Sequence, residues 1–229
     1  MHCAGSRVRM GQLSPNVEKS RSCTNKASAL VSASFMSPSR ATLLVMLSPL
    51  NWRVQCSSTQ VNYLPREGAV FRRFSCRDFE LIGTIDPTRN EDGAIEEYFP
   101  QHRYRDAATA RLHAYGEGPF CRFSVARGIT RGGLYIITVN EAPVYAGECE
   151  NLSKRYDSTG YGGISPRNCF HGGQPTNCRI NALILAEAKC GSTIELWFHP
   201  TSGEKTDRLG AETDLIQSLR PIWNRAGMG

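Results

Sequence analysis

Hydrophobic and polar positions are most regularly ordered in the last hundred residues of this 229-residue chain. β-Branched and aromatic residues run over 133–139 and resume over 144–148 after a short break, and a third stretch, 193–198, alternates with polar residues. These runs predict a hairpin followed by a third strand. Because cross-strand neighbours share a face, Tyr135 and Tyr145, ten residues apart, are expected on the same side of the hairpin.

Three further segments have the spacing of amphipathic helices. A short helix is expected over 152–156, with Asn151 as its N-cap residue. A longer helix is expected over 176–191, where apolar residues recur at helical intervals, with Thr176 able to cap it. A last helix over 211–219 should end before Pro221, since proline cannot continue a helix.

The preceding region, 63–130, has the acids and aromatics of ordered protein but no catalytic spacing. A helix is expected over 104–114 and a short strand over 120–125, with a loop over 86–93. The region is therefore interpreted as an α/β structural flank of the domain at 131–229.

The first 62 residues are rich in Ser and Arg and lack a sustained period, which predicts a disordered tail. An organellar transit peptide, and upstream sequence outside the mature protein, remain alternatives. The tail holds seven basic residues and one acid, so it carries the whole formal charge of +6. The other 167 residues have 20 charges of each sign, so net charge does not identify a partner for the folded part.

Cysteine usage and hydropathy indicate a soluble, cytoplasmic protein. Nine cysteines cannot all pair, and they are interpreted as reduced thiols. No apolar stretch reaches the roughly 18 residues that a membrane-spanning helix needs. A structural zinc site is rejected, because no pair within the candidate set has the short spacing of such sites. That set comprises Cys149, Cys169, His171, Cys178 and Cys190.

Two short motifs and three later residues resemble the GIY-YIG nuclease family. Gly133-Leu134-Tyr135 and Val144-Tyr145-Ala146-Gly147 are similar to its paired strand motifs. Arg155 follows Tyr145 by ten residues, and Glu212 precedes Asn224 by twelve, which is close to the family's order of arginine, glutamate and asparagine. The resemblance covers about the last hundred residues and implies an α+β fold with a small three-stranded antiparallel sheet flanked by helices.

The resemblance implies a metal-dependent DNA endonuclease. Glu212 would bind Mg²⁺, or another divalent cation such as Mn²⁺, because a hard cation takes oxygen ligands and keeps several waters. Arg155 would hold the phosphate with an always charged fork. Tyr135 or Tyr145 would act as or orient the base, its pKa lowered from about 10 by the metal and Arg155. Asn224 would brace the site.

One position departs from the family pattern. Many members have His or Tyr four residues after the helical arginine, whereas this chain has Thr159. Tyr156, Tyr161 or His171 could serve instead. The alternative function is therefore a nucleic-acid-binding module that keeps the fold without turnover.

A glycine-rich stretch over 160–173 and the start of the next helix carry side chains suited to phosphates and base edges. The segments 163–170 and 172–181 resemble restriction-type members of the family. DNA contact is expected there, although a loop held by its own hydrogen bonds is the alternative. The expected DNA-binding residues are Arg167, Asn168, Gln174, Asn177 and Arg179.

Each site residue also has an ordinary structural explanation. Aromatic residues are favoured in strands, and charged residues near helix ends complement the dipole. The ordered spacing of all five favours the site. Cleavage of two strands by one small site suggests a homodimer or sequential nicking.

Overall fold

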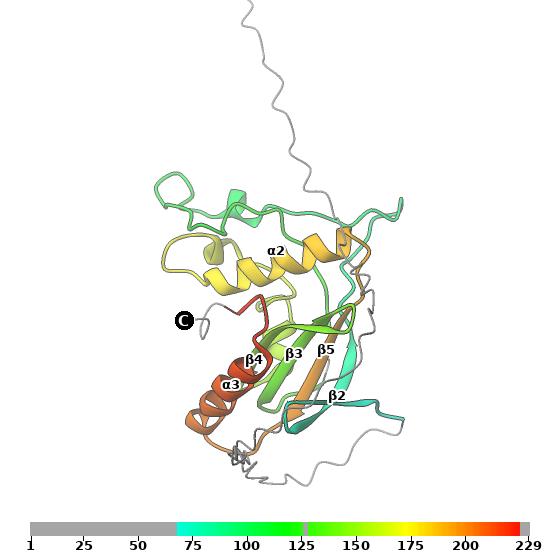
Figure 1. The fold of residues 1–229 in the computed structure, drawn as a ribbon. Coiled ribbons are helices and arrows are strands. Elements are labelled where there is room, and N and C mark those ends of the chain that lie inside the picture. Colours follow the sequence, from blue (N-terminus) through cyan, green and yellow to red (C-terminus); the bar gives the residue numbers. More distant parts are fainter. Residues whose placement is uncertain (1–67, 126–127, 225–229) are drawn as a thin grey trace, which may run out of the picture. The chain divides into compact units, whose positions relative to one another are not determined.

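The computed structural model describes residues 68–125 and 128–224, and it contains one antiparallel sheet in the order β1-β2-β5-β3-β4 (Figure 1). The expected three-stranded sheet is wrong, because the region before residue 131 contributes two further strands; the α+β class itself agrees with the structure. The strands are β1 (Phe71–Phe74), β2 (Arg77–Thr84), β3 (Gly133–Val139), β4 (Ala142–Cys149) and β5 (Ile194–Pro200).

Within these described ranges the α-helices are α1 (Leu152–Tyr156), α2 (Pro175–Lys189) and α3 (Lys205–Leu219), and the 3-10 turns are η1 (Pro100–Arg103) and η2 (Pro166–Cys169). Asn151 caps α1 as expected, its side chain accepting from the amide of Lys154 at 2.9 Å. α2 begins with proline in its first turn and has Gln174, not Thr176, at its N-cap. α3 begins six residues before the expected start.

The two faces of the sheet bury separate cores. β3 alternates between them, with Tyr135 and Ile137 on one face and Leu134 and Ile136 on the other. The first face packs against α1, α2 and the segment before β3. The second packs against α3 (Figure 1), and Phe74 and Phe79 of β1 and β2 belong to its core. A register shift between Ile137 and Thr138 interrupts the pairing of β3 with β4.

The expected helix over 104–114 is wrong, and so is the strand over 120–125. The segment after η1 consists of turns, and Phe120 makes only an isolated bridge to Tyr98. Most of the apolar residues that recur at helical intervals in 104–114 are alanines, and most residues of the segment are exposed. It therefore has no broad apolar stripe whose burial would stabilise a helix.

The region before β3 is nevertheless part of the same packing. Ile85, Cys121 and Phe123 belong to the core that contains Tyr135. The division at residue 131 stays a prediction, and the tail expected over 1–62 lies outside the described residues.

Five described cysteines are free thiols, as expected, whereas Cys190 is disulfide-bonded. None of the described helices has the length and apolar character needed to cross a membrane.

Candidate functional site

Four tyrosines meet on the α1 and α2 face of the sheet. Tyr135 comes from β3, Tyr145 from β4, Tyr156 from α1, and Tyr161 from the following loop. The Tyr161 hydroxyl lies 3.0 Å from that of Tyr135 and 3.3 Å from that of Tyr145. The expectation that Tyr135 and Tyr145 share a face is confirmed, with 6.1 Å between their ring centroids.

Gly147 makes room for this cluster. It lies opposite Tyr135 in the β3–β4 register, and a Cβ there would be 2.4 Å from the Tyr135 hydroxyl oxygen. No side chain can be accommodated at that distance without moving the ring. The last glycine of the second strand motif thus lets the ring of Tyr135 lie across the backbone of β4.

Burial raises the pKa of both motif tyrosines. Tyr135 is 1% exposed, and burial raises its pKa well above the ordinary phenol value, with the neighbouring phenols adding to the effect and Arg155 opposing it. Burial, followed by Tyr161, likewise raises the pKa of Tyr145. Desolvation outweighs the lowering of the Tyr135 pKa that was expected from Arg155, and the lowering expected from a bound metal stays a prediction. At neutral pH both phenols are neutral.

The position that departs from the family pattern has a local role in a turn. The hydroxyl and amide of Thr159 both donate to the Asp157 carboxylate, at 2.7 and 2.8 Å. Of the suggested replacements, Tyr161 lies between the motif tyrosines, whereas His171 is exposed in a loop. The buried Tyr156 hydroxyl has no hydrogen-bond partner within the described ranges.

Arg155 projects from α1 toward the tyrosines. Its guanidinium carbon lies 5.7 Å from the ring centroid of Tyr161, and its Nη2 donates to the backbone carbonyl of Glu148 at 3.5 Å. The side chain is half-buried, yet it makes no ion pair with any carboxylate in 68–125 or 128–224. A desolvated cation without a close counter-charge is costly, which favours an anionic ligand at this position.

Glu212 approaches the same place from α3. Burial raises the pKa of this half-buried carboxyl, and the charge of Glu148 raises it further, while the Glu148 backbone amide and Arg155 oppose the shift. The charge of Glu212 in turn contributes to the raised pKa of Tyr145. Glu212 is therefore electrostatically coupled to both Tyr145 and Arg155.

A buried ion pair, which the sequence did not single out, supports this arrangement. Arg208 Nε donates to Glu148 Oε2 at 3.2 Å, with the side chains only 9% and 10% exposed, and Arg208 Nη1 donates to the Gly203 carbonyl at 2.8 Å. Two signals were available in the sequence. Glu148 directly follows the second strand motif, and Arg208 lies one helical turn before Glu212.

Asn224 is buried at the end of the described chain and braces β4. Its amide nitrogen donates to the carbonyl of Ala146 at 2.8 Å, and its amide oxygen accepts from the Ala146 backbone nitrogen at 2.9 Å. Trp223 donates to the Val144 carbonyl at 2.8 Å. The side chain thus takes the place of a neighbouring strand beside Tyr145.

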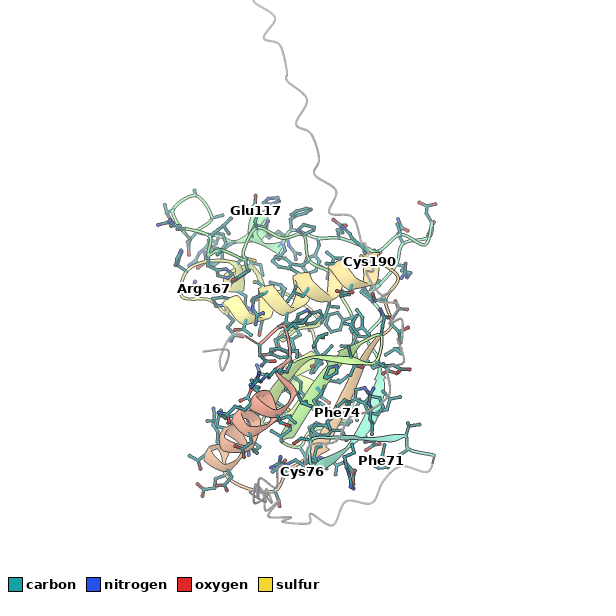
Figure 2. The ribbon with its side chains drawn as sticks, viewed as in Figure 1. Phe71, Phe74, Cys76, Glu117, Arg167 and Cys190 are labelled. Carbon is teal, nitrogen blue, oxygen red and sulfur yellow. The ribbon has the colours of Figure 1, made fainter. Side chains whose placement is uncertain are left out.

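The expected DNA-binding residues fall into two groups. Three of them interact within the fold. Arg167, beside the start of α2 (Figure 2), donates to the carbonyl of His171, and Arg179 donates to the carbonyl of Trp223 at 2.6 Å. Asn168 is buried. Gln174 and Asn177 line a surface pocket of about 370 Å³ that also includes Arg155. Gln174 and Asn177 are thus brought next to Arg155, and Arg179 lies close enough to Tyr145 for its charge to act on that phenol.

Beside the tyrosine cluster and Arg155, Glu212 is the candidate metal ligand. Within the described part of the chain, no group of three or more His, Cys, Asp or Glu side chains gathers in a way that could hold a metal. Zinc needs three or four such protein ligands. A single half-buried carboxylate, such as that of Glu212, suits Mg²⁺ or Mn²⁺, which retain water ligands.

No family model matches the sequence, and no curated protein matches it either. Among solved structures, a glutamate-to-alanine mutant of bacteriophage T4 EndoII is similar to this chain at 21% identity and a TM-score of 0.33, over 50% of this chain and 86% of that chain. The similarity is weak.

Proposed function

We propose that this protein is a metal-dependent DNA endonuclease that hydrolyses phosphodiester bonds through a GIY-YIG-type site. The observation that carries the proposal is the half-buried guanidinium of Arg155, which has no carboxylate in ion-pairing contact in the described residues and lies beside a coupled carboxylate, Glu212, and a tyrosine cluster. Phosphodiester hydrolysis needs charge stabilisation on the non-bridging oxygens and a positioned water. These side chains could provide both.

In this mechanism Arg155 binds a non-bridging oxygen of the phosphate, where its planar fork opposes the charge that develops in the transition state. Glu212 would hold Mg²⁺ or Mn²⁺. The bound cation would supply further positive charge at the phosphate. The Glu148 backbone amide orients the Glu212 carboxylate, and the Glu148 carbonyl steadies Arg155.

The tyrosines act as hydrogen-bonding groups rather than as ionised bases. With a raised pKa, each phenol keeps its proton at neutral pH and can donate it to a hydrogen bond. Tyr145 is the better candidate for contact with the attacking water, because it is more exposed than Tyr135, at 7% against 1%, and it is coupled to Glu212. Tyr161 links the two hydroxyls and holds their orientation.

The proposal is tested with supercoiled plasmid incubated with the full chain, in Mg²⁺ or Mn²⁺ and in EDTA. Nicked or linear products are expected only with the metal. The alternative is a DNA-binding module without turnover, which Thr159 favours because it stands where many members of the family have His or Tyr. Retarded but intact plasmid under every metal condition would establish that alternative and overturn the nuclease proposal.

Arg208 is expected to act as a positioning residue. Replacing Arg208 by lysine keeps the charge but cannot make both contacts, so the backbone of Glu148 should shift beneath Glu212 and Arg155. We expect kcat to fall about 30-fold and the half-saturating metal concentration to rise, while DNA affinity changes less than about twofold. Cleavage rates across a metal titration, with anisotropy for affinity, measure these changes.

Lysine is chosen because alanine would leave the buried Glu148 charge unpaired, at a cost of about 3 kcal/mol. A stability change alone would lower the active fraction without moving the metal dependence. An Arg208→Lys protein with an unchanged metal requirement and unchanged kcat would show that the joint contacts of Arg208 to Glu148 and Gly203 do not position the site.

A further inference from the structure

A surface pocket opens beside Arg155 at the junction of several elements. It lies where β4 ends and α1, α2 and α3 begin, and its lining is mostly charged or amide side chains. Arg155 both lines this pocket and faces the tyrosine cluster. A molecule bound to Arg155 at the proposed catalytic site could therefore extend directly into the pocket.

The pocket has an excess of positive charge. Its lining includes the cations Lys154, Arg155 and Lys205 and the acids Glu148 and Glu150. Glu148 is already neutralised by Arg208, which is not part of the lining, and Glu150 pairs with Lys205 at 3.4 Å. Lys154 and Arg155 remain without a carboxylate partner in the part of the chain that the structure describes.

The neutral lining favours a phosphate over a base. No aromatic side chain lines the pocket, so a nucleobase would find no ring to stack on. Asn177 donates to the side-chain carbonyl of Gln174 at 2.7 Å, which leaves the exposed Gln174 amide nitrogen as a donor for an anionic oxygen. Positive charge and amide donors together are suited to a phosphodiester.

We infer that this pocket binds the phosphodiester next to the one that is cleaved, on the same DNA strand, with Lys154 and Lys205 as its charged contacts. The inference rests on the proposed function, because Arg155 is taken to hold the scissile phosphate. It places the path of the bound strand from Glu212 past Arg155 toward the start of α2. In the complex, the Lys205 ammonium would contact both the phosphate and the carboxylate of Glu150, with which it is already paired.

Binding of a labelled DNA duplex, followed by fluorescence anisotropy in EDTA, tests the inference without turnover. Lys154→Ala and Lys205→Ala are each expected to weaken binding about fivefold and to reduce the slope of log affinity against log salt by about one. Glu150→Gln should tighten binding severalfold, because it removes a negative charge from the lining. A partly unfolded variant would not bind more tightly.

Lys189→Ala provides the matched control, since Lys189 pairs with Glu97 and does not line the pocket. Its affinity and salt slope should equal those of the wild type. Unchanged affinity and slope in both pocket-lysine variants, or no binding of DNA by the wild type, would overturn the inference. Plasmid cleavage by the same proteins is scored separately. If the wild type cleaves plasmid and the pocket-lysine variants bind DNA as it does, only the inferred phosphate pocket is refuted. If the wild type does not cleave plasmid but the variants lose affinity as predicted, only the nuclease activity is refuted.

Discussion

Replacing Glu212 by glutamine is expected to lower the cleavage rate by about three orders of magnitude or more, because the substitution removes the only charged oxygen ligand proposed for the cation. The same substitution should raise the thermal stability of the metal-free protein. In the fold, burial and Glu148 hold the pKa of Glu212 above its unfolded value of about 4.3. The ionised carboxylate therefore costs stability at every pH above that value, and the cost disappears as the pH falls below it.

Glutamine keeps the shape of the side chain and can still accept from the Glu148 amide, so the fold should not be disturbed. Plasmid cleavage and the Tm in EDTA at pH 7.5 measure the two effects together. Asp214→Asn, an exposed acid on the same helix, is the matched control and should change neither. A lowered Tm with cleavage intact would mean that Glu212 has a structural role and no role in hydrolysis.

Replacing Arg155 by alanine is expected to reduce kcat by about 10²- to 10³-fold, since it removes the cation aimed at the phosphate. Replacing it by lysine should recover part of that loss, because the charge returns without the planar fork. Among the described residues, the Arg155 guanidinium makes one long hydrogen bond, of 3.5 Å, and one ring contact. The cost to folding should therefore be small, and single-turnover cleavage rates would report the chemical step.

Arg105→Ala is a suitable control, because this arginine is 92% exposed and remote in sequence from the site. Full activity is expected for it. Should the lysine variant be no better than alanine, geometry rather than charge would dominate at Arg155. An alanine variant with wild-type rates would remove Arg155 from the mechanism.

The elements after residue 131 were predictable because their hydrophobic period is local. β3, β5, α1 and α2 follow from runs and caps within each segment, and no distant partner has to be known. β2 was missed because its stabilisation is not local. Its alternation is broken by a bulge between Leu81 and Gly83, and it is held by pairing with β5, more than a hundred residues later.

The proposed site was predictable where it coincides with strand and helix motifs. Tyr135, Tyr145 and Arg155 lie near one another as the spacing suggested. Their electrostatics could not be predicted, because the pKa of a phenol depends on how deeply the fold buries it. Glu148 and Arg208 were missed for a related reason, since a buried ion pair between a strand and a helix has no short sequence spacing.

The brace at Asn224 limits how two copies of this chain could associate. β4 is the outermost strand of the sheet on its side, and an open strand edge normally invites pairing with another chain. Here the Asn224 amide and the Trp223 backbone occupy hydrogen-bonding groups of Val144 and Ala146. A dimer that continued the sheet across β4 would first have to break these three hydrogen bonds, so two copies of this chain would be expected to meet through side chains on another surface.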